Sequence, residues 1–229
     1  MRRALFTGVA IAALLTLGVA GPAQATTHHR FPGRTAEVSV LHAVPNTPVD
    51  VYLNHKLILD DFKPGTLAGP LAVKAGTYTV SITAATAKND HHPVIGPLRL
   101  TFHAARSYTI AAHLTPAGKP TATLYLNTIA KTPKGDGRLI VRHIAAAPAV
   151  DVYANGALTM RNLTNPHQSK LNVKAGTYSV AVTLHKTTAP VIGPAPVKVM
   201  KHTDTIVYAW GSAAQGNLTV AVQTVPTNR

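Results

Sequence analysis

The 229-residue sequence contains no cysteine, only eight acidic residues and a single glutamate, Glu37. Without cysteine the chain has neither a disulfide framework nor a lipid-modified cysteine, so its folded domains must be held by their hydrophobic cores. With so few carboxylates and no thiol, hydrolytic catalysis would have to use a serine–histidine site. Neither Ser107 nor Ser212 has a recognisable histidine-bearing context.

The motifs of common catalytic sites are missing as well. The sequence has no Gly-x-Ser-x-Gly elbow, no His-Glu-x-x-His helix and no phosphate-binding loop. We therefore predict that the protein is not an enzyme and that its motifs require no cofactor.

Aromatic residues are also few: one tryptophan, four phenylalanines and seven tyrosines. Single-stranded nucleic acids are bound by exposed rings interleaved with cations, and sequence-specific readers carry recognisable motifs. Neither feature is present, so we expect no specific nucleic-acid recognition.

Positive charge, in contrast, is abundant. The 22 lysines and arginines give the chain a formal net charge of +14, and it also has twelve histidines. Without Arg2 and Arg3, which lie in a predicted signal segment, 20 basic and eight acidic residues remain, or +12. Such a charge attracts anionic partners through a screened long-range field. The expected partners are an anionic cell-wall polymer or an extracellular protein.

Residues 1–25 have the pattern of a signal peptide. Arg2 and Arg3 precede a mostly apolar stretch, residues 5–19, which is followed by the small-x-small sequence of residues 23–25. The mature chain is expected to begin at Thr26 and to be secreted, with any attachment to the cell wall loose and non-covalent. No second apolar span follows, so no transmembrane segment is expected after cleavage. The general secretory and twin-arginine routes both stay open.

A repeated block organises the rest of the chain. Val49, Asp50, Val51 and Tyr52 follow His42, and the same residue types return 101 positions later, as residues 150–153 behind His143. This repetition predicts a tandem of two copies of one domain. The predicted divisions are a lead-in at residues 26–35, a first domain at 36–130, a linker at 131–137 and a second domain at 138–226.

Within each copy the apolar residues recur with the period of two that is typical of strands. In the first copy the predicted strands cover residues 37–42, 49–53, 57–59, 71–73, 77–83, 93–102, 107–114 and 121–129. No segment has a helical period, so the sequence predicts an all-β fold with two tandem antiparallel β-sandwich domains. The shift between copies falls from 101 to 97 at Pro190, which indicates that the second copy has lost residues in loops. Thr205 is then matched with Thr109, at a shift of 96.

These residues resemble a known family. The pattern of His42, the block at residues 48–52, Gly76-Thr77-Tyr78 and Tyr108-Thr109, together with its second copy, is similar to the DUF4397 domain. The resemblance covers nearly all of residues 36–226. It implies an immunoglobulin-like sandwich in secreted or cell-surface bacterial proteins, and it brings no catalytic residues and no assigned function.

The repeated pairs His42/Asp50 and His143/Asp151 have two interpretations. In one, the carboxylate orients the imidazole at a ligand or metal site. In the other, the two residues fasten the loop between the first two strands by bonding to its backbone. We favour the second interpretation, because no third ligand recurs and His55 is replaced by Gly156 in the second copy.

Three further features are weighed in the same way. Asp60 and Asp61 form a carboxylate pair, but their counterparts are Arg161 and Asn162, so we interpret them as a solvated turn. Trp210 is the one candidate for an aromatic platform. The recurrent tyrosines at positions 52, 78, 153 and 178 suit the core.

The sequence thus favours a structural or binding protein associated with anionic envelope material or a protein partner. The alternative is a small-ligand or metal-binding module that uses the His/Asp pairs.

One metal hypothesis concerns the mature N-terminus. If the mature chain begins Thr26-Thr27-His28, its amine, two backbone amides and the His28 imidazole match the square-planar ligand set of Cu(II) or Ni(II). We expect a visible absorption band on titration of the mature protein with Cu(II), and loss of that band when Thr26 is removed. An unchanged spectrum after this trimming would overturn the hypothesis.

Overall fold

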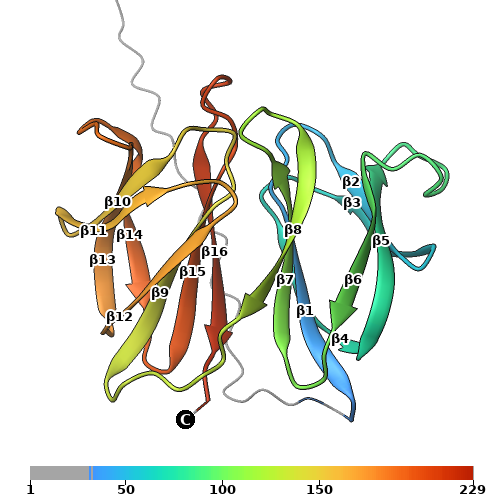
Figure 1. Cartoon of the computed structure of the whole chain (residues 1–229), viewed down its shortest axis with the longest axis horizontal. Coiled ribbons are helices and arrows are strands. Elements are labelled where there is room, and N and C mark those ends of the chain that lie inside the picture. The colour runs from blue at the N-terminus through green and yellow to red at the C-terminus, as the bar shows by residue number, and fades with distance from the viewer. Residues whose placement is uncertain (1–30, 32, 229) are drawn as a thin grey trace, which may run out of the picture.

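The computed structural model describes residue 31 and residues 33–228, and in this part of the chain it contains sixteen β-strands and no α-helix (Figure 1). The first eight strands are β1 (Thr35–His42), β2 (Val49–Leu53), β3 (Lys56–Phe62), β4 (Leu67–Lys74), β5 (Gly76–Ala84), β6 (Ile95–Phe102), β7 (Ser107–Leu114) and β8 (Pro120–Asn127). The second eight are β9 (Asp136–His143), β10 (Val150–Ala154), β11 (Ala157–Leu163), β12 (Gln168–Lys174), β13 (Gly176–Leu184), β14 (Pro190–Val199), β15 (Thr203–Trp210) and β16 (Thr219–Pro226). The predicted signal segment and His28 lie outside the described residues.

Each set of eight strands forms a sandwich of two four-stranded sheets. In the first domain the strand orders are β4-β1-β7-β8 and β3-β2-β5-β6, and the second domain repeats them as β12-β9-β15-β16 and β11-β10-β13-β14. Alternate apolar residues such as Val49 and Val51, or Val150 and Val152, point into the core between the two sheets. The predicted all-β tandem of sandwiches is therefore confirmed.

One strand pair in each domain differs from the antiparallel prediction. β1 pairs with β7 in parallel, and β9 pairs with β15 in parallel. Five strands, β2 to β6, separate β1 from β7 in the chain. The two strands are therefore not joined by a hairpin and need not run in opposite directions.

The register of these pairs also corrects the alignment of the two copies. Glu37 is paired with Ser107 and Arg138 with Asp204, so the shift is 97 for β7 and β15 (204 − 107), not 96. A slip of one residue moves a side chain to the opposite face of a sheet. Thr109 therefore corresponds to Ile206, and both face away from the core of their own domain.

The connection between the domains is bonded along its length. β9 starts at Asp136, so the last two residues of the predicted linker lie in a strand. Buried Arg138 donates to Asp204 at 2.8 Å and to the carbonyl oxygens of Thr128, Ala130 and Lys131 at 3.4–3.5 Å. The connection is thus fixed to the first strand of the second domain.

The inner sheets of the two domains pack face to face (Figure 1). Their contact is a third hydrophobic cluster, which joins Leu41, Ala43, Ala111 and Tyr125 of the first domain to Ile140, Ile144, Ile206, Tyr208 and Val225 of the second. Asn165 donates across this boundary to the carbonyl oxygen of Leu114, and Thr109 donates to Gln223. The two sandwiches therefore share a buried interface with both apolar contacts and hydrogen bonds.

Arg142 lies at the centre of this interface and is fully buried. Its guanidinium stacks 4.2 Å from the ring centroid of Tyr125 and donates to Asn127 at 2.9 Å, both in the first domain. It also donates to the Tyr208 hydroxyl at 2.6 Å and to Gln168 at 2.8 Å. Burial raises the pKa of both Tyr125 and Tyr208, so these tyrosines stay protonated phenols. The buried charge is satisfied by neutral acceptors and aromatic faces.

Replacement of Arg142 by alanine should therefore destabilise the whole chain. It removes the hydrogen bonds and ring contacts and leaves buried acceptors unpaired, so we expect the free energy of unfolding to fall by about 2–4 kcal/mol. Urea denaturation measures this change. Arg161→Ala, on the exposed face of β11, is the matched control and should change stability by less than about 0.5 kcal/mol. Equal effects of the two substitutions would contradict the role of Arg142.

Candidate functional site

The two predicted histidines are buried backbone anchors. Each is the last residue of the first strand of its domain, β1 or β9, just before the chain crosses to the other sheet. His42 Nε2 lies 2.8 Å from the carbonyl oxygen of Thr47, and its Nδ1 accepts from the N–H of Val44 at 3.4 Å. His143 repeats the pattern, with Nε2 2.9 Å from the carbonyl oxygen of Pro148 and Nδ1 accepting from an N–H at 3.4 Å. A neutral imidazole with its proton on Nε2 satisfies both bonds.

The two predicted aspartates hold a different part of each domain. Asp50 Oδ1 accepts from the N–H of Asp61 at 2.9 Å, and Asp151 Oδ1 accepts from the N–H of Asn162 at 2.7 Å. Asp61 and Asn162 have φ values of 46° and 54°, at irregularities in the pairing of β2 with β3 and of β10 with β11. Asp and Asn adopt this left-handed conformation more readily than most residues, which explains the residue types found there.

The histidine and the aspartate of each pair therefore have separate backbone partners, and none of the hydrogen bonds identified joins them. This arrangement supports the structural interpretation of His42/Asp50 and His143/Asp151 over the ligand or metal site. Within residues 31 and 33–228 we find no group of three or more His, Asp or Glu side chains placed to hold a metal ion. Asp60 and Asp61 are exposed as expected, but they lie within strand β3 and not in a turn.

A histidine that the sequence reasoning missed does contact Asp151. His185, from the β13–β14 connection, lies 2.9 Å from Asp151 Oδ1 through its Nδ1. Burial opposes ionisation of Asp151, but the N–H groups of Asn162 and Lys186 and the His185 imidazole together lower its pKa. His185 has no equivalent bond in the first domain, so the search for features common to both copies passed over it.

Trp210 is part of the domain interface. Its side chain packs against the third cluster and approaches Gly65 of the first domain, where an added Cβ would lie 3.1 Å from the indole ring. Trp210 is thus a half-buried ring at the domain interface, and this partial cover by the first domain favours a structural role over an open aromatic platform. Trp210 is the last residue of β15, and the outward face of this strand is buried only by the other domain. The sequence of one copy gives no sign of that contact.

The recurrent tyrosines divide into two groups. Tyr78 and Tyr178 pack against the cores and donate to the carbonyl oxygens of Lys74 and Lys174 at 2.8 Å. Tyr153 faces outward instead, because it alternates with core-facing Val152, and it is half-buried. The prediction that this tyrosine belongs to the core is wrong; the alternation around Val152 was the signal that places it outside.

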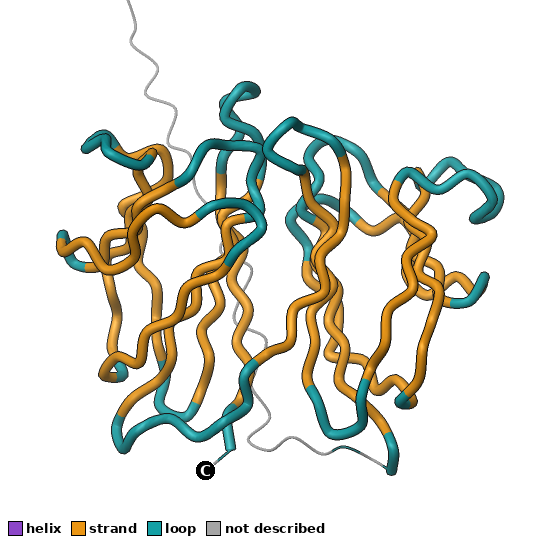
Figure 2. The backbone as a smooth tube through the Cα atoms, in the orientation of Figure 1, coloured by secondary structure: helices purple, strands orange, loops and turns teal. Residues whose placement is uncertain are grey.

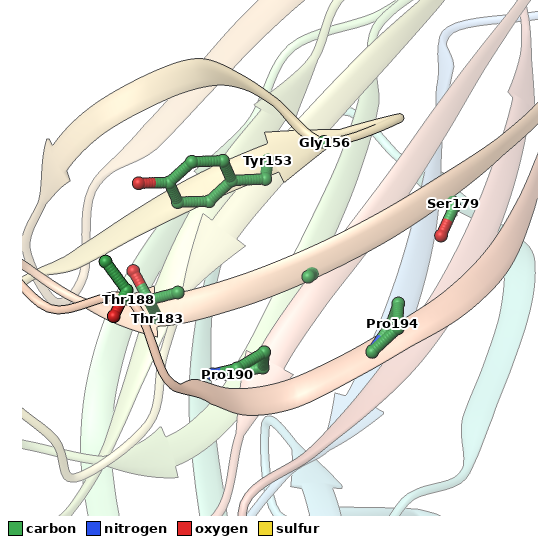
Figure 3. Close-up of a pocket in the computed structure, with 8 residues that line it drawn as sticks. Tyr153, Gly156, Ser179, Thr183, Thr188, Pro190 and Pro194 are labelled. Carbon is green, nitrogen blue, oxygen red and sulfur yellow. The ribbon is translucent and has the colours of Figure 1, made fainter.

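Tyr153 lines a pocket of about 360 Å³ on the outer face of the second domain (Figure 3). The pocket is bounded by Tyr153, Gly156, Ser179, Ala181, Thr183, Thr188, Pro190 and Pro194. Figure 3 shows the hydroxyl groups of Tyr153, Thr183 and Thr188 toward one end and the two proline rings along one side. The pocket therefore offers an aromatic ring, aliphatic ring faces and neutral hydroxyls.

The exposed charge of the molecule is almost entirely positive. Of the 18 lysines and arginines in the described part of the chain, sixteen are exposed, all except Arg138 and Arg142. Five of the eight acidic side chains are buried, and only Asp60 and Asp61 are exposed. Most carboxylates are thus used inside the fold, while the cations remain at the surface.

Many of these cations share one end of the molecule, the lower edge in Figures 1 and 2. The pairings of β1, β4, β5, β6 and β7, and of their counterparts, bring the β4–β5, β6–β7, β8–β9, β12–β13 and β14–β15 connections to this end. We call it the cationic end; its exposed residues are Arg34, Lys74, Arg106, Lys131, Lys134, Lys174 and Lys201. Lys174 is paired with Asp136 at 2.8 Å. The exposed carboxylates lie elsewhere, on β3.

The model of the family described as "Domain of unknown function (DUF4397)" matches residues 36–153 and residues 144–228. The two matches cover most of the chain and overlap at residues 144–153. No curated protein matches the chain. The described residues contain no helix long and apolar enough to cross a membrane.

The buried histidines generate a prediction about pH. Burial lowers the pKa of His42 and His143, and also that of His113, although hydrogen bonds to carbonyl oxygens partly oppose this. Below about pH 6.5 the unfolded chain binds protons that the folded chain excludes, so stability should fall as the pH drops. Asp204 acts in the opposite sense below pH 6, since burial raises its pKa to about 6.

The contribution of the histidines is isolated by His42→Gln combined with His143→Gln, because glutamine places an uncharged donor near the position of Nε2. We expect the double variant to lose less stability than the wild-type chain between pH 6.5 and 5. The difference should be about 1.4 kcal/mol for each unit by which burial lowers the histidine pKa values. Urea denaturation at several pH values measures the slope. His91→Gln, in an exposed loop, is the control; an unchanged slope in the double variant would show that these anchors do not control acid stability.

Proposed function

The chain belongs to the DUF4397 family, whose function is unassigned, and we propose that this member is an exported, non-catalytic protein that binds anionic polymer outside the cell. The observation that carries the proposal is the cationic end, where seven exposed lysines and arginines from both domains lie together. A phosphodiester or carboxylate polymer of the envelope is the partner that this charge favours.

The fold supports this proposal by keeping the cations in a fixed array. The buried interface around Arg142 and the bonded β8–β9 connection fix the turns of one domain relative to those of the other. A rigid array loses less conformational freedom on binding than one on mobile arms. An extended polymer can therefore contact turns of both domains at once, which raises its effective affinity.

Export is part of the proposal and follows from the signal pattern of residues 1–25. With no cysteine in the chain, attachment to the envelope would be by charge, without a lipid anchor on cysteine. Release of the protein by salt is the corresponding expectation.

The proposal predicts binding that depends steeply on salt. Immobilised poly(glycerol phosphate) should retain the full mature chain at low salt and lose it as sodium chloride rises from 50 to 500 mM, since the attraction is screened over about 10 Å at 0.1 M. Neutral dextran is the control surface. Retention that ignores salt would contradict the charge mechanism.

The cationic end is tested by two variants of equal net charge. The first changes Lys74, Arg106, Lys134 and Lys201 to glutamate; the second changes Lys56, Lys88, Lys119 and Arg161, which are exposed elsewhere. We expect the first to weaken retention by about tenfold or more and the second by only about two- to threefold. Equal losses would show that net charge, and not this end of the molecule, determines binding.

A further inference from the structure

The outer sheet faces of the two domains differ because one connecting loop has different lengths. Residues 85–94 join β5 to β6 in the first domain, whereas only residues 185–189 join β13 to β14 in the second. The remaining strands of these sheets keep the same order in both domains. The loop is therefore the main local difference between two otherwise matching faces.

The long loop covers the outer face of the first domain. It leaves β5 at Ala84, which pairs with Val49 at the start of β2, yet its Asp90 bonds to His55, in the turn after the end of β2, at 2.8 Å. The loop must thus run back along the sheet for about four residues, or about 13 Å. Beneath it Tyr52, Ser81 and Thr83 are only 8%, 3% and 0% exposed.

The short loop leaves the same face open in the second domain. Thr187 bonds back to the carbonyl oxygen of Leu184 through both its N–H and its hydroxyl, so this connection turns tightly at the sheet end. Gly156 stands where the first domain has His55, and no atom lies within 4 Å of a Cβ added there. The 360 Å³ pocket beside Tyr153 occupies the side of the sheet that the long loop covers in the first domain.

The lining of this pocket restricts its ligand. No lysine, arginine, histidine, aspartate or glutamate is among the eight lining residues, so the site has no group to pair with an ionic ligand. The Thr183 hydroxyl is buried and has no hydrogen-bond partner, a deficit that a ligand hydroxyl can satisfy. The Tyr153 ring and the rings of Pro190 and Pro194 suit the aliphatic face of a saturated ring.

From this geometry we propose that the outer face of the second domain is a binding site for a neutral sugar, with Tyr153 as the stacking ring and Thr183 as a hydrogen-bonding group. Its volume lies near the lower end of the range of about 300–1,000 Å³ for small-ligand pockets, which suits one or two sugar units. The site does not depend on the cationic end: its binding is insensitive to salt, whereas binding of an anionic polymer is lost with salt.

Nuclear magnetic resonance on the ¹⁵N-labelled full mature chain tests the proposal at 500 mM sodium chloride. The ligands are glucose, galactose, N-acetylglucosamine, their methyl glycosides and the β-1,4 disaccharide of N-acetylglucosamine. We expect saturable shifts for at least one of them, confined to residues 153–156, 179–183 and 188–194. Tighter binding of the disaccharide than of the methyl glycoside assigns the site to a glycan chain, and equal binding assigns it to a free sugar.

Two threonine variants provide a matched comparison. Thr183→Val and Thr83→Val each remove a buried, unpartnered hydroxyl at equivalent positions of the two domains, so their effects on stability should be alike. Only Thr183→Val should weaken sugar binding, by about three- to tenfold. Tyr153→Ala should weaken it by about tenfold or more. Equal binding by Tyr153→Ala and the wild-type chain overturns the proposal.

Exchange of the loops tests the site in both directions. Residues 85–92 grafted in place of 185–189, together with Gly156→His, should close the pocket and abolish sugar binding. The reverse graft in the first domain, with His55→Gly, should expose Tyr52 and raise the number of bound sugars from one to two. If no sugar shifts the outer-face resonances, or if a peptide of residues 85–94 shifts them in place of every sugar, the proposal fails.

Discussion

The packing of the two inner sheets against each other is the constraint on which the other features depend. It buries the central strands of the two inner sheets, such as β7, β9 and β15, with Arg142 enclosed between Tyr125 and Tyr208. The outer sheet faces, the edge strands β4 and β12 and the two ends of the molecule remain exposed to partners. Because the β8–β9 connection is also bonded to buried Arg138, the turns of both domains have one fixed arrangement. Trp210, the one tryptophan of the chain, packs against this interface and is half-buried there.

The two domains share one scaffold and differ in their loops and exposed faces. The histidine and aspartate anchors, the bulges at Asp61 and Asn162, and the tyrosine bonds to Lys74 and Lys174 are kept in both copies. These are the groups that close the backbone of each sandwich. The two copies differ in loop length and in the side chains on the sheet faces, where changes leave the strand order intact. A feature shared by both copies therefore indicates the fold of one domain, whereas a feature of one copy belongs to the domain interface, as Arg142 does, or to a surface on which the domains differ.

The sequence predicted the fold well because apolar alternation and the 101-residue repeat are local signals, and DUF4397 membership confirms the family that the repeated block suggested. The sequence predicted less well which face of a sheet each side chain occupies. The alignment of Thr205 with Thr109 was one residue in error, since equal residue types do not reveal which face of β15 is outward. Tyr153 was assigned to the core because the recurrent tyrosines lie on alternating strand positions. Its counterpart Tyr52 is buried in the first domain, but the β5–β6 loop that lies over Tyr52 is shorter in the second copy. Such effects depend on residues distant in sequence.

The asymmetry of the domain interface limits which domains can be joined in this way. Arg142 corresponds to Leu41 in the first domain, so one inner face carries the cation and the other the Asn127 acceptor and the Tyr125 ring. If two copies of the second domain packed inner face to inner face, two guanidinium groups would be buried in one contact without those partners. Burial of unpaired charges is strongly unfavourable. The contact between inner faces thus joins one first domain to one second domain in a defined order.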